Sequence, residues 1–326
     1  MKLKQAGEKA IVELAREIFR KGPKVKIGIG DDAAVLDVEG VGLVATTDML
    51  VQSTHFPPEA TPEHMARKAV VVNISDLAAM GAEPLGLLFS VALPRSLDMK
   101  FVERMIREMD AVAKEYGTYV VGGDLDESDQ IIISGVAFGQ VQKGKALKRS
   151  GAKAGDLVAV TGTLGEASAG LKILLEKLPH AGFRPLVDAQ LRPAARLKEG
   201  RALVKSGAVT AAIDITDGLA SNLWQISKES KVKIKIEREL VPENPLVRRL
   251  ATAHGLNVDD FVLYGGEDFE LLFTVKSSGW TKVRRALERI GTSASVIGRV
   301  ESGRGVFMKT KGKTRPLPDR GYEHFK

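Results

Sequence analysis

The segment from Thr61 to Gly81 constrains the fold more than any other part of the chain. Thr61-Pro62-Glu63 is a strong helix start, with Thr as the N-cap and Pro at the first helical position, and Gly81 is a natural stop. Between positions 69 and 80 the sequence is apolar on nearly every side of the helix. A helix of this kind belongs in the protein interior. We therefore expect the rest of the fold to cover it.

Asn73 and Asp76 are polar residues within this apolar helix. They are three positions apart and share a face. A carboxylate in such surroundings needs a partner, and a metal ion would serve. A cap or a buried hydrogen bond to the backbone would serve equally well, so the helix alone leaves both possibilities open.

The segments around this helix follow helix and strand patterns that predict an α+β domain. The expected helices are 11–19 and 98–115, and the expected strands are 33–38, 41–47, 85–93, 118–121 and 131–141. The polar, basic stretch 142–155 predicts a boundary between two domains, 1–145 and 146–326. No repeat of 20–50 residues is evident.

The composition is that of a globular protein, with 44% hydrophobic and 27% charged residues among 326. No apolar run approaches the roughly 20 residues of a membrane helix, and the N-terminus lacks a signal-peptide core. These features predict a cytoplasmic protein without a membrane partner. The absence of cysteine excludes disulfides, thiolate catalysis and cysteine-ligated metals.

The net charge of +7 raises the possibility of nucleic-acid binding. The basic residues, however, are scattered along the chain among acidic neighbours, and aromatic residues make up only 5%. We therefore expect no nucleic-acid partner. The excess of positive charge better suits an enzyme with anionic substrates.

Acidic residues recur in short motifs with glycine or threonine neighbours. Each motif alone also reads as an ordinary turn or helix cap. Together they offer a set of oxygen ligands without obvious histidine, and such a set selects Mg²⁺. The motifs are Gly28-Ile29-Gly30-Asp31-Asp32, Thr46-Thr47-Asp48, Asp76, Gly123-Asp124 and Asp214-Ile215-Thr216-Asp217.

Magnesium held by carboxylates usually carries substrate phosphates, so the expected chemistry is nucleotide-dependent phosphoryl transfer. No nucleophile-elbow or zinc-protease motif competes with this interpretation. Residues 139–145 nearly spell a phosphate-binding P-loop, but Ala146 stands where Ser or Thr would hold magnesium. We treat that stretch as a chance match.

The motifs, in this order along the chain, resemble those of the thiamine-monophosphate kinase family, in the aminoimidazole-ribonucleotide-synthetase-like superfamily. The resemblance runs from near residue 25 to the C-terminus. Besides the acidic motifs above, it rests on His55-Phe56, Val72-Asn73-Ile74-Ser75-Asp76-Leu77-Ala78-Ala79-Met80-Gly81, Arg149-Ser150-Gly151-Ala152, Gly265-Gly266-Glu267-Asp268-Phe269-Glu270-Leu271 and Gly321-Tyr322-Glu323-His324-Phe325.

The resemblance implies a two-domain fold, with an N-terminal α+β domain that dimerises through its sheet and a C-terminal α/β domain. It implies a homodimeric kinase that converts ATP and thiamine monophosphate into ADP and thiamine diphosphate, with several Mg²⁺ ions as cofactors. The ionised acceptor phosphate needs no general base, so no catalytic side chain is assigned.

The resemblance also assigns roles to individual positions. The implied substrate contacts are His55, Glu267 and Tyr322, and the implied ATP contacts are Gly123, Asp124, Arg149, Thr216 and Tyr116. The implied magnesium ligands are Asp32, Thr46, Thr47, Asp48, Asp76, Asp124, Asp214 and Asp217. Asp31 receives no role. Thr46 and Thr216 stand where Ser is common in the family, with the hydroxyl retained.

Two rival functions remain at this point. One is another ATP-using enzyme of the superfamily, of the hydrogenase-maturation or ribonucleotide cyclo-ligase type. The maturation protein relies on a C-terminal cysteine, which this chain lacks. The other rival is a non-catalytic nucleic-acid-binding protein, for which salt-sensitive binding without ATP turnover would be the sign.

Overall fold

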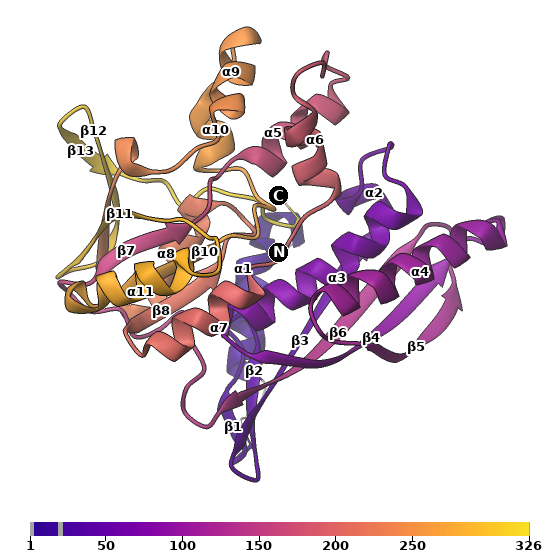
Figure 1. Cartoon of the computed structure of the whole chain (residues 1–326), viewed down its shortest axis with the longest axis horizontal. Helices are drawn as coiled ribbons and strands as arrows, with labels where there is room; N and C mark the ends of the chain where they lie inside the picture. The colour runs from indigo at the N-terminus through magenta and orange to yellow at the C-terminus, as the bar shows by residue number, and fades with distance from the viewer. Residues whose placement is uncertain (1–2, 19–21, 326) are drawn as a thin grey trace.

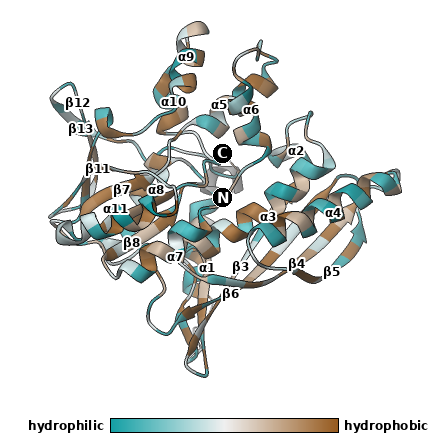
Figure 2. Cartoon of the chain, in the orientation of Figure 1, coloured by the Kyte–Doolittle hydropathy of each residue, from teal (hydrophilic) through white to brown (hydrophobic). Residues whose placement is uncertain are grey.

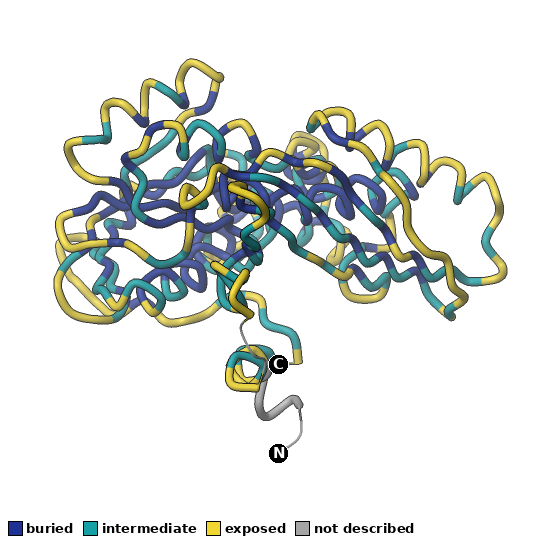
Figure 3. The backbone as a smooth tube through the Cα atoms, turned by 90° about the horizontal axis from the view of Figure 1, so that it is seen from below, coloured by how far each residue is buried: buried dark blue, intermediate teal, exposed yellow. Residues whose placement is uncertain are grey.

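A computed structural model describes residues 3–18 and 22–325 of the chain. Two β-sheets lie side by side, each with helices packed on it (Figure 1). Seen from below, each half has a buried interior, and the buried segments continue through the middle of the molecule (Figure 3). No helix within the described residues is long and apolar enough to cross a membrane.

The first sheet has six strands in the order β1-β2-β3-β6-β4-β5. Only β4 and β5 run parallel, and the other neighbours are antiparallel. Helices α3 and α4 cover one face of this sheet (Figure 1). The strands are β1 (Val25–Ile27), β2 (Ala34–Val38), β3 (Val41–Val51), β4 (Glu83–Leu93), β5 (Val120–Glu127) and β6 (Ile132–Gln142), and the helices are α3 (Pro62–Ala79) and α4 (Met99–Glu115).

Helix α3 is the buried helix predicted from the sequence. The Thr61 hydroxyl accepts a hydrogen bond from the His64 amide, and the His64 ring accepts one from the Thr61 amide, so the two residues form a capping box. Most of the helix is buried, including the side chains of Ile74 and Leu77. The prediction of an interior helix is confirmed.

The second sheet has seven strands in the order β13-β12-β9-β11-β7-β10-β8. Alternate strand residues face opposite layers, so that Val158 packs toward α5 and α8 while Ala159 packs toward α7 and α11. The strands are β7 (Leu157–Thr161), β8 (Val209–Asp214), β9 (Lys233–Glu237), β10 (Leu271–Val275), β11 (Ala294–Glu301), β12 (Gly305–Thr310) and β13 (Lys313–Pro316). The covering helices are α5 (Glu166–Leu175), α7 (Leu197–Ser206), α8 (Leu219–Ser230) and α11 (Trp280–Glu288).

Covered strands are correspondingly hydrophobic, as β4 and β8 illustrate (Figure 2). The remaining helices complete the outside of the fold. They are α1 (Leu3–Ile18), α2 (Gln52–His55), α6 (Arg184–Leu191), α9 (Pro245–Ala253), α10 (Val258–Val262) and the short 3₁₀ turns η1 (Arg238–Leu240) and η2 (Ser277–Gly279). The helix expected at 11–19 corresponds to α1, and its last position, 19, lies outside the described residues.

The acidic residues Asp48 and Asp124 lie inside strands, whereas the expected strands 41–47 and 118–121 end before them. β3 continues past Asp48 to Val51, and β5 contains Asp124 within its eight residues. The reason in β3 is the apolar run Met49-Leu50-Val51, which extends the pairing with β6. In β5, Gly123 lets the strand approach β4 closely, because an added Cβ would stand 2.0 Å from the Phe89 carbonyl oxygen.

The packing of α7 on α3 yields a stability prediction. A Cβ added at Gly200 would stand 1.9 Å from the carbonyl oxygen of Ala78. Alanine normally favours a helix over glycine by about 1 kcal/mol, but overpacking costs about 1–3 kcal/mol. We expect Gly200→Ala to lower the melting temperature in scanning calorimetry. Gly22→Ala, with nothing within 4 Å, is the control. An unchanged or higher melting temperature for Gly200→Ala would contradict the close packing.

Candidate functional site

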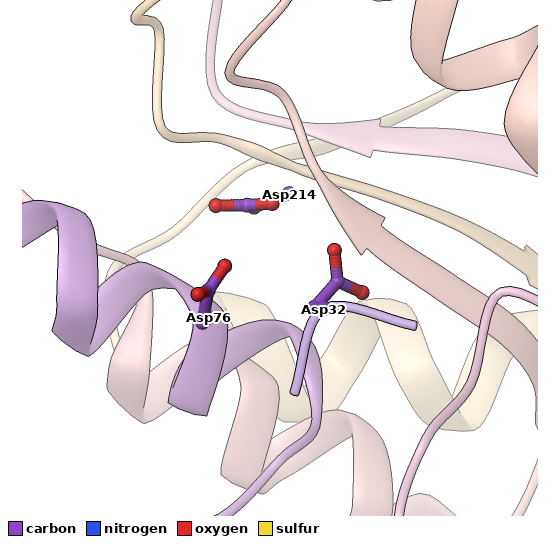
Figure 4. A group of neighbouring side chains, drawn as sticks. All are labelled: Asp32, Asp76 and Asp214. Atoms are coloured by element: carbon purple, nitrogen blue, oxygen red, sulfur yellow. The ribbon is translucent and has the colours of Figure 1, made fainter. Parts of the chain in front are cut away.

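Three carboxylates from distant parts of the chain meet between the two sheets (Figure 4). Asp32 follows β1, Asp76 lies in α3, and Asp214 ends β8. One carboxylate oxygen from each lies within 4.8 Å of the other two. Three of the oxygen ligands expected from the acidic motifs therefore lie together, where the first sheet, α3 and the second sheet meet.

Hydroxyl groups and a fourth carboxylate surround the three. The Ser75 hydroxyl donates to Asp214 Oδ2 over 2.5 Å, and the Thr46 hydroxyl donates to Asp76 Oδ2. Asp48 lies on the same face of β3 as Thr46 and is hydrogen-bonded to Asp76. The cluster thus presents only oxygen ligands.

Burial and mutual repulsion make the charged forms of these carboxylates costly. Burial, followed by repulsion from Asp32, raises the pKa of Asp214 to about 8. Burial and then repulsion from Asp48 hold the pKa of Asp76 well above its usual range. Burial also raises the pKa of Asp48. Such a site gains most from a bound positive charge.

Arg149 supplies part of that charge. Its guanidinium donates to Asp32 Oδ1 over 2.7 and 3.2 Å, and its backbone amide donates to Asp31 Oδ1 over 2.5 Å. Asp31 is thereby given a positioning contact, and burial raises its pKa to about 6. Among the described residues, the buried Oδ2 of Asp32 has no hydrogen-bond partner. An unpartnered buried carboxylate oxygen beside two more carboxylates fits a hard cation.

Asp217 and Thr216 lie in the loop that leads from β8 to α8. Burial raises the pKa of Asp217 to about 6. In the part of the chain that the structure describes, its carboxylate accepts one long hydrogen bond, from the Gln225 side-chain amide at 3.5 Å. The Thr216 carbonyl accepts from the Glu267 amide over 2.8 Å, so this loop is tied to the Gly265-Gly266-Glu267 segment.

The residues with implied substrate contacts gather on another side of the cluster. The His55 and His324 rings are 5.5 Å apart, and the Tyr322 and His324 rings 4.9 Å. Burial lowers the pKa of His55, whose Nδ1 accepts from the Val51 amide. The Tyr322 amide in turn donates to the Asp217 carbonyl over 3.0 Å, which fixes the C-terminal segment at the site.

Glu267 is held in a strained loop. Its φ of +66° is rare for a non-glycine residue, and Gly266 before it leaves room for the Thr216 carbonyl oxygen, which would lie 2.3 Å from a Cβ. Lys68 Nζ lies 2.8 Å from both Glu267 oxygens, and Gln190 donates to one of them over 2.6 Å. A cavity of about 280 Å³ opens beside this loop, lined in part by Arg192.

Four predicted site residues lie away from the cluster within one chain. Asp124 lies on the edge strand β5, in register with Ser90, Ser134 and Met49 on the neighbouring strands. Met49 and Asp48 are adjacent in β3 and face opposite sides, so Asp124 lies on the face opposite to Asp48. Three strand spacings separate β5 from β3, a distance of about 14 Å. Thr47 shares that open face and donates to the Gly135 carbonyl. Gly123 is on the same edge strand. The Tyr116 phenol instead accepts from the Ala195 amide over 2.8 Å.

Several site residues were missed by the sequence reasoning. They are Ser75, Lys68, Gln190 and His324. Ser75 and Lys68 belong to α3, where a polar residue in an otherwise apolar helix was the available signal. Lys68 is only 2% exposed. Gln190 carries no such signal, because only the packing of α6 brings it to Glu267.

Comparison with known proteins places the chain in a family. Residues 30–141 match the AIR synthase related protein, N-terminal domain, and residues 153–311 match the corresponding C-terminal domain. The thiamine-monophosphate kinase of Pyrococcus horikoshii is 38% identical over 300 residues, with 91% of each chain covered. That of Aquifex aeolicus is 36% identical over the whole length of both chains.

A solved structure shows the same fold and the same extent. AaThiL complexed with AMPPCP and TMP superimposes with a TM-score of 0.88 at 33% identity, covering 99% of each chain. The match therefore includes both sheets and the region between them where the acidic cluster lies. On sequence identity and structure together, the chain belongs to the thiamine-monophosphate kinase family of the AIR synthase related proteins.

Proposed function

We propose that this protein transfers the γ-phosphoryl group of ATP to thiamine monophosphate, giving ADP and thiamine diphosphate. The observation that carries the proposal is the clustering of Asp32, Asp76 and Asp214, which no cation among the described residues fully compensates. Full-length similarity to thiamine-monophosphate kinases, one of them complexed with an ATP analogue and TMP, supports the choice of substrates.

Magnesium is the cation we propose for the cluster, because every ligand is a hard oxygen atom. Asp32, Asp48, Asp76 and Asp214 would hold it, with the Thr46 hydroxyl close by and Asp217 nearer the substrate side. Bound magnesium offsets the charge of the phosphate oxygens during transfer.

The chain's own residues position the reactants and balance charge. Arg149 can turn one of its donors toward a phosphate while keeping its contact with Asp32, since a guanidinium carries five N–H donors. Ser75 fixes the orientation of the Asp214 carboxylate. The acceptor oxygen belongs to an ionised phosphate, so transfer in line needs no general base.

We place thiamine monophosphate beside His55, Glu267 and Tyr322. Glu267 is oriented by Lys68 and Gln190, and it offers a carboxylate to the cationic thiazolium ring. Neutral His55 and Tyr322 offer aromatic surfaces to the same ligand. In this arrangement domains 1–145 and 146–326 each contribute ligands, and the reaction takes place between them.

In a homodimer, Asp124, Thr47 and Gly123 could contribute to the site of the partner chain. The open face and edge of the first sheet expose large apolar side chains, with Met49 58% and Leu125 73% exposed. An uncovered edge strand with apolar residues is a pairing surface. We propose that two chains associate through this face, so that Asp124 of one chain serves the ATP and metal site of the other. Tyr116 stays a proposed contact on the adenine side.

The product assay tests the function directly. With Mg²⁺, ATP and thiamine monophosphate we expect thiamine diphosphate, detected by chromatography, and no product in EDTA. Asp76→Asn removes a ligand and should lower turnover by about 100-fold or more, whereas Asp110→Asn on the exposed side of α4 should not change it. Absence of product from the unmodified protein would reject the proposal in favour of another reaction of the superfamily.

The raised pKa of Asp214 predicts how stability depends on pH without metal. Its pKa is about 8 in the folded chain and about 3.9 when unfolded, so the folded state binds more protons between these values. The stabilisation that the raised pKa of Asp214 contributes to the folded state is complete below about pH 4 and is lost as the pH rises through about 8. We expect the melting temperature in EDTA to fall by about 5 °C or more between roughly pH 5.5 and 8.5.

Two controls accompany this measurement. Asp214→Asn should flatten the pH dependence, and Mg²⁺ should raise the melting temperature more at the higher pH, because it binds the ionised cluster. A metal-free protein whose melting temperature rises over this interval would contradict the charge balance described for the site.

Mixed dimers test whether Asp124 serves the partner's site. Asp76→Asn and Asp124→Asn chains, each nearly inactive alone, should regain activity when co-refolded in equal amounts. Half of the dimers are then mixed, and one of their two sites is intact, so about a quarter of normal activity returns. No recovery, with mixed dimers verified by mass spectrometry, would place both residues in the same chain's site.

A further inference from the structure

We infer that the groove between α7 and α11 is a second binding site, for a small organic polyphosphate. The groove has a volume of about 840 Å³, within the range of small-molecule sites. It is lined by residues of α7 and α11, which pack side by side over the same face of the second sheet (Figure 1). The proposed active site does not include any residue of this groove.

Six cationic side chains line the groove, three from each side. They are spaced at i, i+3 and i+7, so each trio forms a row on one helix face. The row on α7 is Lys198, Arg201 and Lys205, and the row on α11 and its C-cap is Lys282, Arg285 and Arg289. Two parallel rows of positive charge thus face one space.

Little negative charge opposes these rows. The Glu83 carboxylate lies 3.3 Å from Arg201, and Lys282 donates to the Ser206 carbonyl over 2.6 Å. Within 3–18 and 22–325, no carboxylate lies within ion-pair distance of the other four, Lys198, Lys205, Arg285 and Arg289. Four unpaired cations facing one space give the groove a local excess of positive charge.

The shape and lining of the groove select the kind of anion. Its lining includes Ala202, Ala286 and Ile290, which offer an apolar surface to a ring. Helix α7 is ten residues long, about 15 Å, which suits a few adjacent phosphates attached to one ring. Guanidinium groups bind phosphate oxygens in pairs. No aromatic residue lines the groove, so a stacking platform for single-stranded nucleic acid is missing among the described residues.

The groove is separated from the acidic cluster by α7 itself. Lys198 and Arg201 lie within two residues of Gly200, whose backbone packs on Ala78 of α3, two residues from Asp76. A ligand in the groove therefore contacts the outer side of a helix whose inner side contacts the helix of the active site. The two sites are distinct, and binding in one can be measured without the other.

Isothermal titration calorimetry in EDTA tests the inference. Without metal, the acidic cluster repels phosphates, so any polyphosphate binding that is measured reports on the groove. We expect tripolyphosphate, ATP and thiamine diphosphate each to bind once per chain, and the two organic ligands to bind more tightly than tripolyphosphate. Lys205→Glu with Arg285→Glu should weaken binding by about tenfold or more and leave kinase turnover unchanged. Lys153→Glu with Lys313→Glu, which changes the net charge equally away from the groove, should leave binding unchanged.

The outcomes separate the possibilities. Whichever of ATP and thiamine diphosphate binds more tightly is the better candidate for the natural ligand, and either result supports the site. Equal weakening by both double variants, with melting temperatures preserved, would overturn it. The inference would also be overturned if a single-stranded oligonucleotide bound more tightly than ATP and if Lys205→Glu with Arg285→Glu abolished that oligonucleotide binding. Loss of kinase activity alone would bear on the proposed function and not on the groove.

Discussion

The structure between the two sheets must hold together carboxylates that repel one another. Asp32, Asp76 and Asp214 each offer an oxygen within 4.8 Å of the others, and an arrangement like this opposes folding unless positive charge enters it. Arg149 compensates only one oxygen of Asp32. The fold therefore leaves negative charge uncompensated at this site, and we propose that a metal-nucleotide complex supplies the missing positive charge.

Rigid packing around α3 keeps these charges together. The helix is buried between the first sheet and α7, with Gly200 allowing backbone contact at Ala78. The loop of Gly266 and Glu267, tied to the Thr216 carbonyl, has a strained backbone conformation at Glu267. Close contacts of this kind leave the acidic side chains few ways to move apart. The cost of placing like charges together is thus offset by apolar burial in both halves of the chain.

Elements with strong local signals could be predicted from the sequence. The cap at Thr61 and the apolar run of α3 were sufficient to predict that helix, because both act within one segment. The candidate site could be predicted only in part. Asp32, Asp76 and Asp214 meet as expected, but Asp124 and Thr47 lie on the opposite face of the first sheet. The face of a strand residue depends on register, and register is decided by partners that are far away in the sequence.

The amino-acid sequence fixes which chemical groups are available: oxygen ligands without cysteine, an apolar helix suited to the interior, and motifs that resemble one kinase family. Which of those oxygens lie close together depends on the packing of the two sheets and α3. The tertiary structure also gathers Lys198, Arg201 and Lys205 opposite Lys282, Arg285 and Arg289, although these residues look scattered along the chain. The physical reason is the same in both cases. Charges act through distance in space, and two helices or strands become neighbours only when the apolar surfaces beneath them are buried together.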